Sequence, residues 1–291
     1  MSNTATVLAF DFGASSGRAI RAVYDGQNLT YEEIHRFENV PIEKDGHLCW
    51  DVETLLKEIH TAIQKAGTFD SLGFDTWGVD FGLLDTDGHL LANPVHYRDV
   101  RTNGKLEQAA ARMPAEELYA HTGNQIMAIN TLFQLLALRE QDPELLQKAE
   151  QILFMPDLFA ALLGAEPVCE RSIASTSQML DPRTGQWSRE VLAAYGLNAN
   201  RFAPLVASGT VTGTLANGAK IIAVAGHDTQ CASAAMPCAE EDAEHTAFLS
   251  CGTWSLLGTE LDVPILTADS CQSGLSNELG ANGKINYLKN I

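Results

Sequence analysis

The chain has 291 residues, enough for one large or two ordinary domains, and its hydrophobic fraction of 45% is typical of a globular protein. Its 19 basic and 37 acidic residues give a net charge of -18. Such a balance argues against a nucleic-acid partner, because nucleic-acid binding depends on Lys and Arg that neutralise phosphates. Any phosphate site in this chain must therefore be built locally, from backbone amides, an arginine or a metal ion.

Targeting and cysteine patterns point to a cytoplasmic protein. The first residues, MSNTATVLAFDF, have no basic start, and an acid interrupts their apolar run, so we expect no signal peptide. No apolar run approaches the roughly 18 residues of a membrane helix, so we expect no membrane partner. The six cysteines are scattered and form no CxxC pair, which argues against a zinc ribbon and favours reduced thiols.

Residues 7–20, VLAFDFGASSGRAI, are the most informative stretch. Apolar residues lead to Asp11, a turn of small residues follows, and a second apolar run begins after Arg18, so we expect strand, turn and strand. A turn with two glycines lets backbone N–H groups converge on an anion. A purely structural hairpin is the alternative. The G-x-S-x-G nucleophile elbow of hydrolases also fits the letters, but it requires a helix after the turn.

The acid before this turn has two interpretations. Asp11 is placed to hold a Mg²⁺ ion through water, since Mg²⁺ keeps much of its hydration shell. It is equally placed to stabilise the turn by accepting backbone N–H bonds. Further along, residues 6–38 predict a three-stranded meander, and Asp51 and Gly67 delimit a helix with apolar residues at helical spacing.

Residues 71–91 predict a strand, a turn and a hairpin whose tip is Asp87-Gly88. Between strand and hairpin, DTWGVD places a tryptophan and a glycine between Asp75 and Asp80. An aromatic ring beside acids suits a sugar, although a core tryptophan is the simpler interpretation. Residues 105–163 are expected to be mostly helical.

A second turn carries a candidate catalytic acid. The apolar strand of residues 221–225 leads into Gly226-His227-Asp228-Thr229, where a helix is expected to begin. In phosphoryl transfer the protein mainly positions groups, and one aspartate accepts the proton of the attacking hydroxyl. Asp228 fits that role. The alternative is an aspartate that only caps the helix.

The last part of the chain repeats the opening pattern. The acidic segment 238–245 is the best candidate for a linker, and AFLSCGTWSLLG, residues 247–258, again places a turn, Gly252-Thr253, between apolar runs. We therefore expect an α/β protein with a complete domain at residues 1–243 and the truncated beginning of a second domain at residues 244–291. Two phosphate turns in two halves suggest a clamp on a nucleotide.

Taken together, these motifs resemble the FGGY carbohydrate kinase family. The resemblance runs from Val7 to Ile291 and is carried by ordered segments: DFGASSGR (11–18), GFDTWGVDFGLLD (73–85), YRDVRTNG (97–104), NTLFQL (130–135), MPDLF (155–159), STSQMLDPRTGQW (175–187), GHDT (226–229), CGTWSLLG (251–258) and LKNI (288–291). It implies a ribonuclease-H-like, actin-type ATPase fold. It also implies that a longer second domain normally completes the nucleotide site, so we expect little activity from this chain by itself.

The resemblance also implies a reaction, ATP-dependent phosphorylation of the 1-hydroxyl of the ketose L-rhamnulose in L-rhamnose breakdown. It assigns proton abstraction to Asp228. The implied sugar contacts are Gly78, His227, Asp228, Thr229 and Asn290. The implied ATP contacts are Ala14, Ser15, Ser16, Gly17, Arg18 and Thr253, with Asp11 at Mg²⁺. Alternatives are a kinase for another ketose, a non-catalytic sugar-binding or regulatory module, and an actin-like ATPase without a sugar substrate.

Overall fold

A computed structural model describes residues 4–238, 242, 245–252 and 254–291. Its main feature is a six-stranded sheet with the order β13-β14-β6-β1-β2-β3. The strands are β1 (Ala5–Phe12), β2 (Ser16–Tyr24), β3 (Leu29–Glu38), β6 (Ser71–Thr76), β13 (Thr210–Thr214) and β14 (Lys220–Ala223). The first three strands form an antiparallel meander, and β6 and β14 continue the sheet in parallel with β1. The predicted meander and the ribonuclease-H-like order are confirmed.

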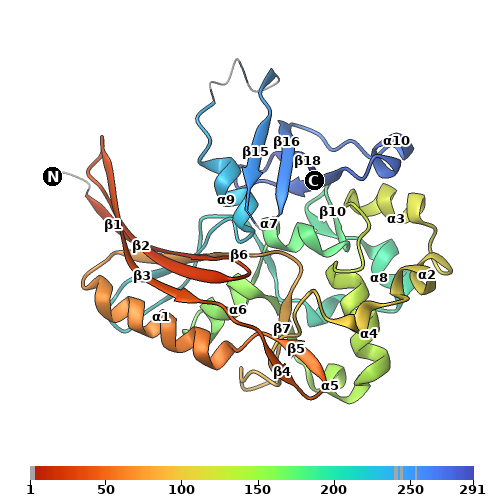
Figure 1. Ribbon diagram of the computed structural model, residues 1–291, viewed down its shortest axis with the longest axis horizontal. Helices are drawn as coiled ribbons and strands as arrows, with labels where there is room; N and C mark the ends of the chain where they lie inside the picture. Colours follow the sequence, from red (N-terminus) through yellow and green to blue (C-terminus); the bar gives the residue numbers. More distant parts are fainter. Residues whose placement is uncertain (1–3, 239–241, 243–244, 253) are drawn as a thin grey trace.

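Local sequence signals fix the helix that follows the meander. Helix α1 (Val52–Ala66) begins after Asp51, whose carboxylate accepts a 3.2 Å bond from the Thr54 amide, and it ends at Gly67 with φ of 67°. Both predicted ends are confirmed. Helix α1 packs on β2 and β3, and α6 (Met155–Leu162) packs on β6 and β14 (Figure 1). The core joins sheet and helix directly, since the Phe12 and Phe159 rings stack at 4.8 Å.

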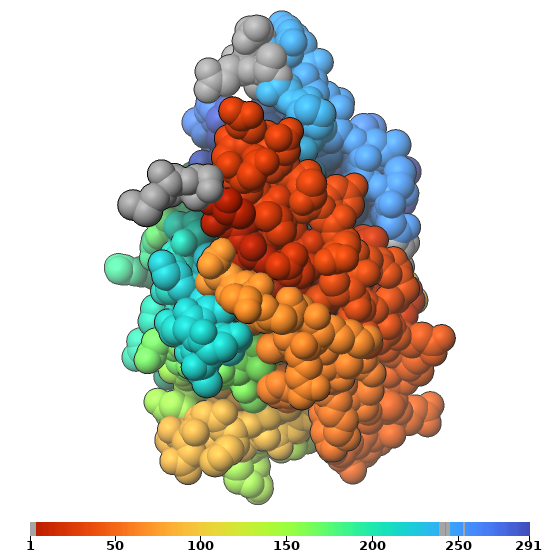
Figure 2. Space-filling model, turned by 90° about the vertical axis from the view of Figure 1, so that its left-hand side faces the viewer, coloured from red at the N-terminus to blue at the C-terminus, as the bar shows by residue number. Residues whose placement is uncertain are grey.

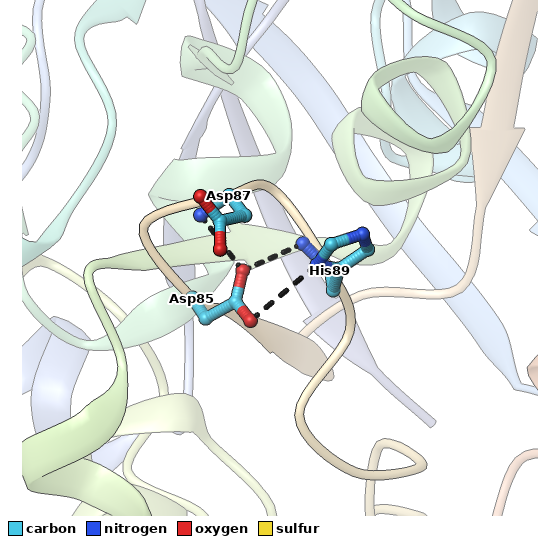
Figure 3. Close-up of side chains that lie close together, drawn as sticks. All are labelled: Asp85, Asp87 and His89. Carbon is cyan, nitrogen blue, oxygen red and sulfur yellow. Dashed lines mark hydrogen bonds and ion pairs between the residues drawn. The ribbon is translucent and has the colours of Figure 1, made fainter.

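The hairpin predicted after β6 is present. Strand β7 (Phe81–Leu84) pairs with β8 (Gln151–Phe154). After β7 the chain turns back through Gly88, whose φ is +80°, and this turn is the predicted hairpin tip. The Asp85 carboxylate accepts bonds from the amides of Asp87 at 2.9 Å and His89 at 2.8 Å (Figure 3). Among the described residues, these three form the one group whose ligand-type atoms gather closely enough for a metal. The hydrogen bonds of an ordinary turn explain that proximity.

A helical region with its own apolar core lies beside the sheet, as predicted for residues 105–163. Its helices are α2 (Lys105–Ala110), α3 (Ala115–Thr122), α4 (Thr131–Gln141), α5 (Pro143–Lys148) and α8 (Arg189–Tyr195). The shorter elements are β4 (Ile42–Lys44), β5 (His47–Cys49), η1 (Val100–Thr102), β9 (Cys169–Glu170), α7 (Arg171–Ala174), η2 (Ser175–Ser177), β10 (Leu180–Asp181), β11 (Gln186–Trp187), η3 (Ala199–Arg201) and β12 (Leu205–Val206).

The C-terminal residues form a second sheet with the order β15-β16-β18-β17, antiparallel throughout. Its elements are β15 (Phe248–Cys251), β16 (Ser255–Leu261), α10 (Ala268–Gln272), β17 (Ser276–Leu279) and β18 (Ile285–Asn290), and α9 (Asp228–Ala234) precedes it. The expected domain boundary between residues 243 and 244 lies outside the described residues. Viewed from the side of the first sheet, the C-terminal segment lies above the N-terminal strands (Figure 2).

Strand β17 ties this second sheet to the rest of the chain. The Asn277 amide donates to the Gly123 carbonyl at 2.8 Å, and the Leu279 amide donates to the Ser175 hydroxyl at 3.0 Å. In the part of the chain that the structure describes, no helix is both long and apolar enough to cross a membrane.

Candidate functional site

A cavity of about 550 Å³ lies where the two sheets meet. The turn after β1, the turn after β6 and the start of α9 form its walls on one side, and residues of β15, β16, β17 and β18 line the other. The cavity brings together most residues predicted for the site: Asp11, Ala14, Ser15, Ser16, Arg18, Gly78, His227, Asp228, Thr229 and Asn290. In parallel sheets, ligand sites form at the carboxyl ends of strands, and β1 and β6 end at this cavity.

The backbone carbonyl groups of the turn after β1 accept the hydrogen bonds that hold this turn in place. The Gly13 amide donates to the Ser16 carbonyl at 2.9 Å, while Asn39 donates from its amide to the Ser15 carbonyl and from its side chain to the Gly13 carbonyl. Within the described residues, no hydrogen bond uses the amides of Ala14 or Ser15. Free N–H groups on a fixed turn favour an anion. Strand β2 follows the turn, so the hydrolase elbow is wrong.

Asp11 and Arg18 face each other across the hairpin. The Arg18 Nε lies 2.7 Å from Asp11 Oδ2, and Nη2 lies 2.5 Å from the same oxygen. This places one cation and one anion at the mouth of the phosphate turn. Asp75 lies beside Asp11 on the neighbouring strand β6, and both residues line the cavity together with Asp228. Within the described residues, these three acids lie too far apart to bind one metal ion directly. Asp11 would hold Mg²⁺ through the water shell of the ion, since its carboxylate lies at the cavity and is not gathered with other acids as a direct metal ligand would be.

These three acids influence each other's protonation. Burial raises the pKa of Asp75 well above its usual value, and the nearby negative charges of Asp11 and Asp228 raise it further. Burial also raises the pKa of Asp228, although the positive charge of His227 partly opposes the rise.

The turn after β6 brings the backbone itself to the cavity. A side chain on Gly78 would place its Cβ 3.2 Å from Thr176 Cγ2 and 3.3 Å from His227 Nε2. Val79 has φ of +66°, a conformation that strains a β-branched residue. Two threonines hold it there: Thr176 Oγ1 accepts from the Val79 amide at 3.1 Å, and Thr131 Oγ1 donates to the Val79 carbonyl at 2.6 Å. The strain lies at the proposed sugar contact.

Asp80 is a buried anchor beneath this turn. Its Oδ2 accepts from the indoles of Trp50 at 2.7 Å and Trp77 at 3.0 Å and from the Tyr97 amide at 3.1 Å, while Oδ1 accepts from Gln134 at 2.9 Å. Burial raises the pKa of Asp80 to about 6, against the opposing hydrogen bonds. Trp77 is thus a core residue whose ring lies 3.9 Å from that of Trp50 at an interplanar angle of 31°, and it also lines the cavity.

The turn before α9 presents the candidate base. The Thr76 amide donates to the Gly226 carbonyl at 2.9 Å, which joins the ends of β6 and β14. His227 occupies the helix cap and Asp228 is the first helical residue, so the helix-cap alternative for Asp228 is wrong. Asp228 Oδ1 accepts from the Thr229 amide at 2.6 Å, and its side chain keeps 41% of its surface exposed. The carboxylate is therefore oriented by its neighbour and open to the cavity.

The remaining predicted residues divide in three ways. Asn290 on β18 donates to the Gln125 side chain at 3.1 Å across the cavity, so it joins the two sides of the site. Gly17 does not line the cavity; a Cβ there would lie 2.2 Å from the Phe37 ring, so packing accounts for this glycine. Thr253 lies outside the described residues, although the adjacent Gly252 lines the cavity.

Among the site residues that sequence reasoning missed is Glu278 on β17. Its Oε2 lies 2.8 Å from His227 Nδ1 and accepts a 2.8 Å bond from Gln230. Burial alone would lower the pKa of His227, but the charges of Glu278, Asp228 and Asp75 raise it to about 9. No local motif marks Glu278, because 51 residues separate it from His227.

Comparisons with known proteins agree with this architecture. Over 98% of its length the chain is 41% identical to a rhamnulokinase of Bacteroides thetaiotaomicron, of which it spans 61%. A carbohydrate kinase of Novosphingobium aromaticivorans superimposes with a TM-score of 0.82 at 20% identity, over 99% of this chain and 63% of that one. A xylulose kinase of Lactobacillus acidophilus superimposes with a TM-score of 0.81 at 16% identity, over 97% and 59%.

The two structures share the actin-like ATPase fold with this chain, and at such identities they establish the fold alone. Residues 6–234 match the N-terminal domain of one family, and the rhamnulokinase relative lies well above the identity at which family membership is in doubt. The chain belongs to the FGGY family of carbohydrate kinases.

Proposed function

We propose that the protein is an ATP-dependent kinase that phosphorylates the 1-hydroxyl of L-rhamnulose, in the cytoplasm and as a step of L-rhamnose breakdown. The 41% identity to a rhamnulokinase supports the substrate. One structural observation carries the chemistry: a single cavity is lined both by Asp228 and by the turn whose amides of Ala14 and Ser15 remain unused within the described residues.

In this proposal the sugar lies against Gly78, His227, Thr229 and Asn290. Asp228 accepts the proton of the 1-hydroxyl, and the hydroxyl oxygen attacks the γ-phosphorus of ATP as the bond to the β-phosphate oxygen breaks, so ADP leaves. The backbone at Gly78 allows the sugar to approach closely, since no side chain projects toward His227 Nε2 there.

The phosphate side of the site is assigned to Ala14, Ser15, Ser16, Arg18 and Thr253, whereas Gly17 is explained by its packing against Phe37. The amides of the first turn and the Arg18 guanidinium supply positive charge in a chain whose net charge is -18. Asp11 would hold Mg²⁺ through water, and the ion would neutralise charge that develops on the phosphates.

The first test is the dependence of ATP turnover on the ketose. ADP formation is measured by a coupled assay with Mg·ATP alone and after addition of L-rhamnulose, L-xylulose or D-fructose. In a protein that also carries the longer second domain of its relatives, we expect ADP formation to require a ketose and to be fastest with L-rhamnulose, while this chain by itself is expected to show little activity. ATP hydrolysis indifferent to added ketose would contradict a sugar kinase, and preference for another ketose would contradict the substrate alone.

Calorimetry separates binding from turnover. We expect L-rhamnulose to bind without nucleotide, because the residues assigned to it lie in the described cavity wall. Binding of L-rhamnulose with no phosphorylated product in the presence of Mg·ATP, in a protein that also carries the longer second domain, would instead identify a sugar-binding module.

A further inference from the structure

A buried ion pair connects the second sheet to the turn that carries Asp228. Glu278 Oε2 on β17 lies 2.8 Å from His227 Nδ1, and the two side chains are only 8% and 11% exposed. The same oxygen accepts a 2.8 Å bond from Gln230 Nε2 on α9. A carboxylate buried to this degree requires partners, and both of its partners belong to the turn and helix of the proposed base.

The other ring nitrogen of His227 faces the proposed base. His227 Nε2 lies 3.4 Å from Asp228 Oδ1, so the imidazole stands between two carboxylates. The other charged groups that act on this pair within the described residues are mostly acidic: Asp75 acts on His227, Asp11 acts on Asp228, and Arg18 beside Asp11 opposes them. In this setting a neutral His227 would leave Asp228 among acids, whereas a charged His227 offsets them.

Burial and charge act on His227 in opposite directions. Burial by itself would lower the pKa of the imidazole and leave it neutral at pH 7. The attraction of Glu278 is the largest opposing influence, and the net result is a pKa of about 9. The positive charge on His227 in turn lowers the pKa of Asp228, which burial raises. A carboxylate that accepts a proton must be ionised beforehand. The positive charge on His227 favours this ionised form of Asp228.

We propose that Glu278 is a positioning residue: from the second sheet it keeps His227 positively charged and oriented, and the charged His227 keeps Asp228 ionised as the proton acceptor. This inference rests on the proposed role of Asp228 and adds a partner that no local sequence pattern indicates. Glu278 itself touches neither substrate nor phosphate in this account; it acts through His227.

The first test measures His227 without any reaction. The ring signals of the eight histidines are followed by NMR from pH 5 to 10, and the His227 signal is identified by its loss in His227→Asn. We expect the His227 pKa to lie near 9 in the parent protein and to fall by about 1–3 pH units in Glu278→Gln. A His227 that titrates at or below its usual pKa of 6.5 in the parent protein overturns the proposal.

The second test is the pH profile of kcat/KM for L-rhamnulose, measured in a protein that also carries the longer second domain. In Glu278→Gln we expect the acid limb to move upward by up to about one pH unit, to the extent that His227 has lost its proton in that pH range and no longer favours the ionised form of Asp228. Glu278→Asp keeps a carboxylate and is expected to restore much of the parent profile. An acid limb that stays in place while His227 has lost its proton overturns the proposal, since a merely structural role would lower the rate at every pH.

A matched control separates this effect from the loss of any acid–histidine pair. Glu58 Oε2 lies 2.6 Å from His35 Nε2, outside the cavity. Glu58→Gln is expected to leave the His227 titration and the acid limb unchanged, and a shift as large as that of Glu278→Gln would contradict a specific role. If Glu278→Gln does not fold, the His227 titrations of the parent protein and of Glu278→Asp still decide.

The two hypotheses fail separately. Full activity of Asp228→Asn would refute Asp228 as the proton acceptor, but the effect of Glu278 on the pKa of His227 would still stand. An unshifted His227 in Glu278→Gln would refute the coupling while ketose-dependent phosphorylation remained.

Discussion

Raising the pH from 6.5 to 9.5 is expected to weaken the folded protein by removing the proton from His227. The folded-state pKa is about 9 and the usual value is 6.5. Because the folded pKa is the higher one, the stabilisation from this residue is complete below pH 6.5 and is lost as the pH rises through 9. A difference of this size corresponds to on the order of 3 kcal/mol in the free energy of unfolding.

The measurement is urea unfolding at fixed pH values between 6 and 10, followed by tryptophan fluorescence, since Trp50 and Trp77 are buried beside the site. His227→Asn serves as the reference, because the asparagine does not titrate. We expect the free energy of unfolding to fall by a few kcal/mol more in the parent protein than in this variant. Equal losses in both proteins across this pH range would refute the reasoning.

Two substitutions test the turn after β6 and its anchor. Gly78→Ala places a methyl group 3.3 Å from His227 Nε2, so we expect the KM for the ketose to rise about tenfold or more with little change in thermal stability; an unchanged KM would show that no substrate lies there. Trp50→Phe removes the 2.7 Å indole bond to the buried Asp80 carboxylate, so we expect urea unfolding to show a loss of about 2 kcal/mol, and a loss below about 0.5 kcal/mol would contradict the anchor role.

Much of the fold follows from local patterns. The meander, the two ends of α1 and the hairpin tip at Asp87-Gly88 could be predicted because alternation, a capping aspartate and glycines at positive φ act over a few residues. The short β4–β5 hairpin was missed. Its three-residue strands carry too little alternation to be recognised, and the Cys49–Val95 bridge and the bond from the His96 amide to the Leu48 carbonyl hold it from elsewhere in the chain.

The site could be predicted only where its residues lie in glycine turns. Asp228 and the turn after β1 follow strands, and that placement is visible in the sequence. Glu278 and the strained conformation of Val79 were not predictable, since each depends on contacts with residues far away in the chain. The structural role of Asp80 could not be predicted either. In the sequence it is an acid near a tryptophan, and only the structure shows that it is buried and accepts hydrogen bonds from two indoles.

The central claim is that Asp228 accepts the proton of a ketose hydroxyl. Asp228→Asn keeps the shape of the side chain but removes the base, and the product is followed by ³¹P NMR with L-rhamnulose and Mg·ATP. In a protein that also carries the longer second domain of its relatives, we predict that L-rhamnulose 1-phosphate forms and that its rate of formation falls by about 10²-fold or more in the variant. Formation of the same product at a near-unchanged rate by Asp228→Asn would contradict the account.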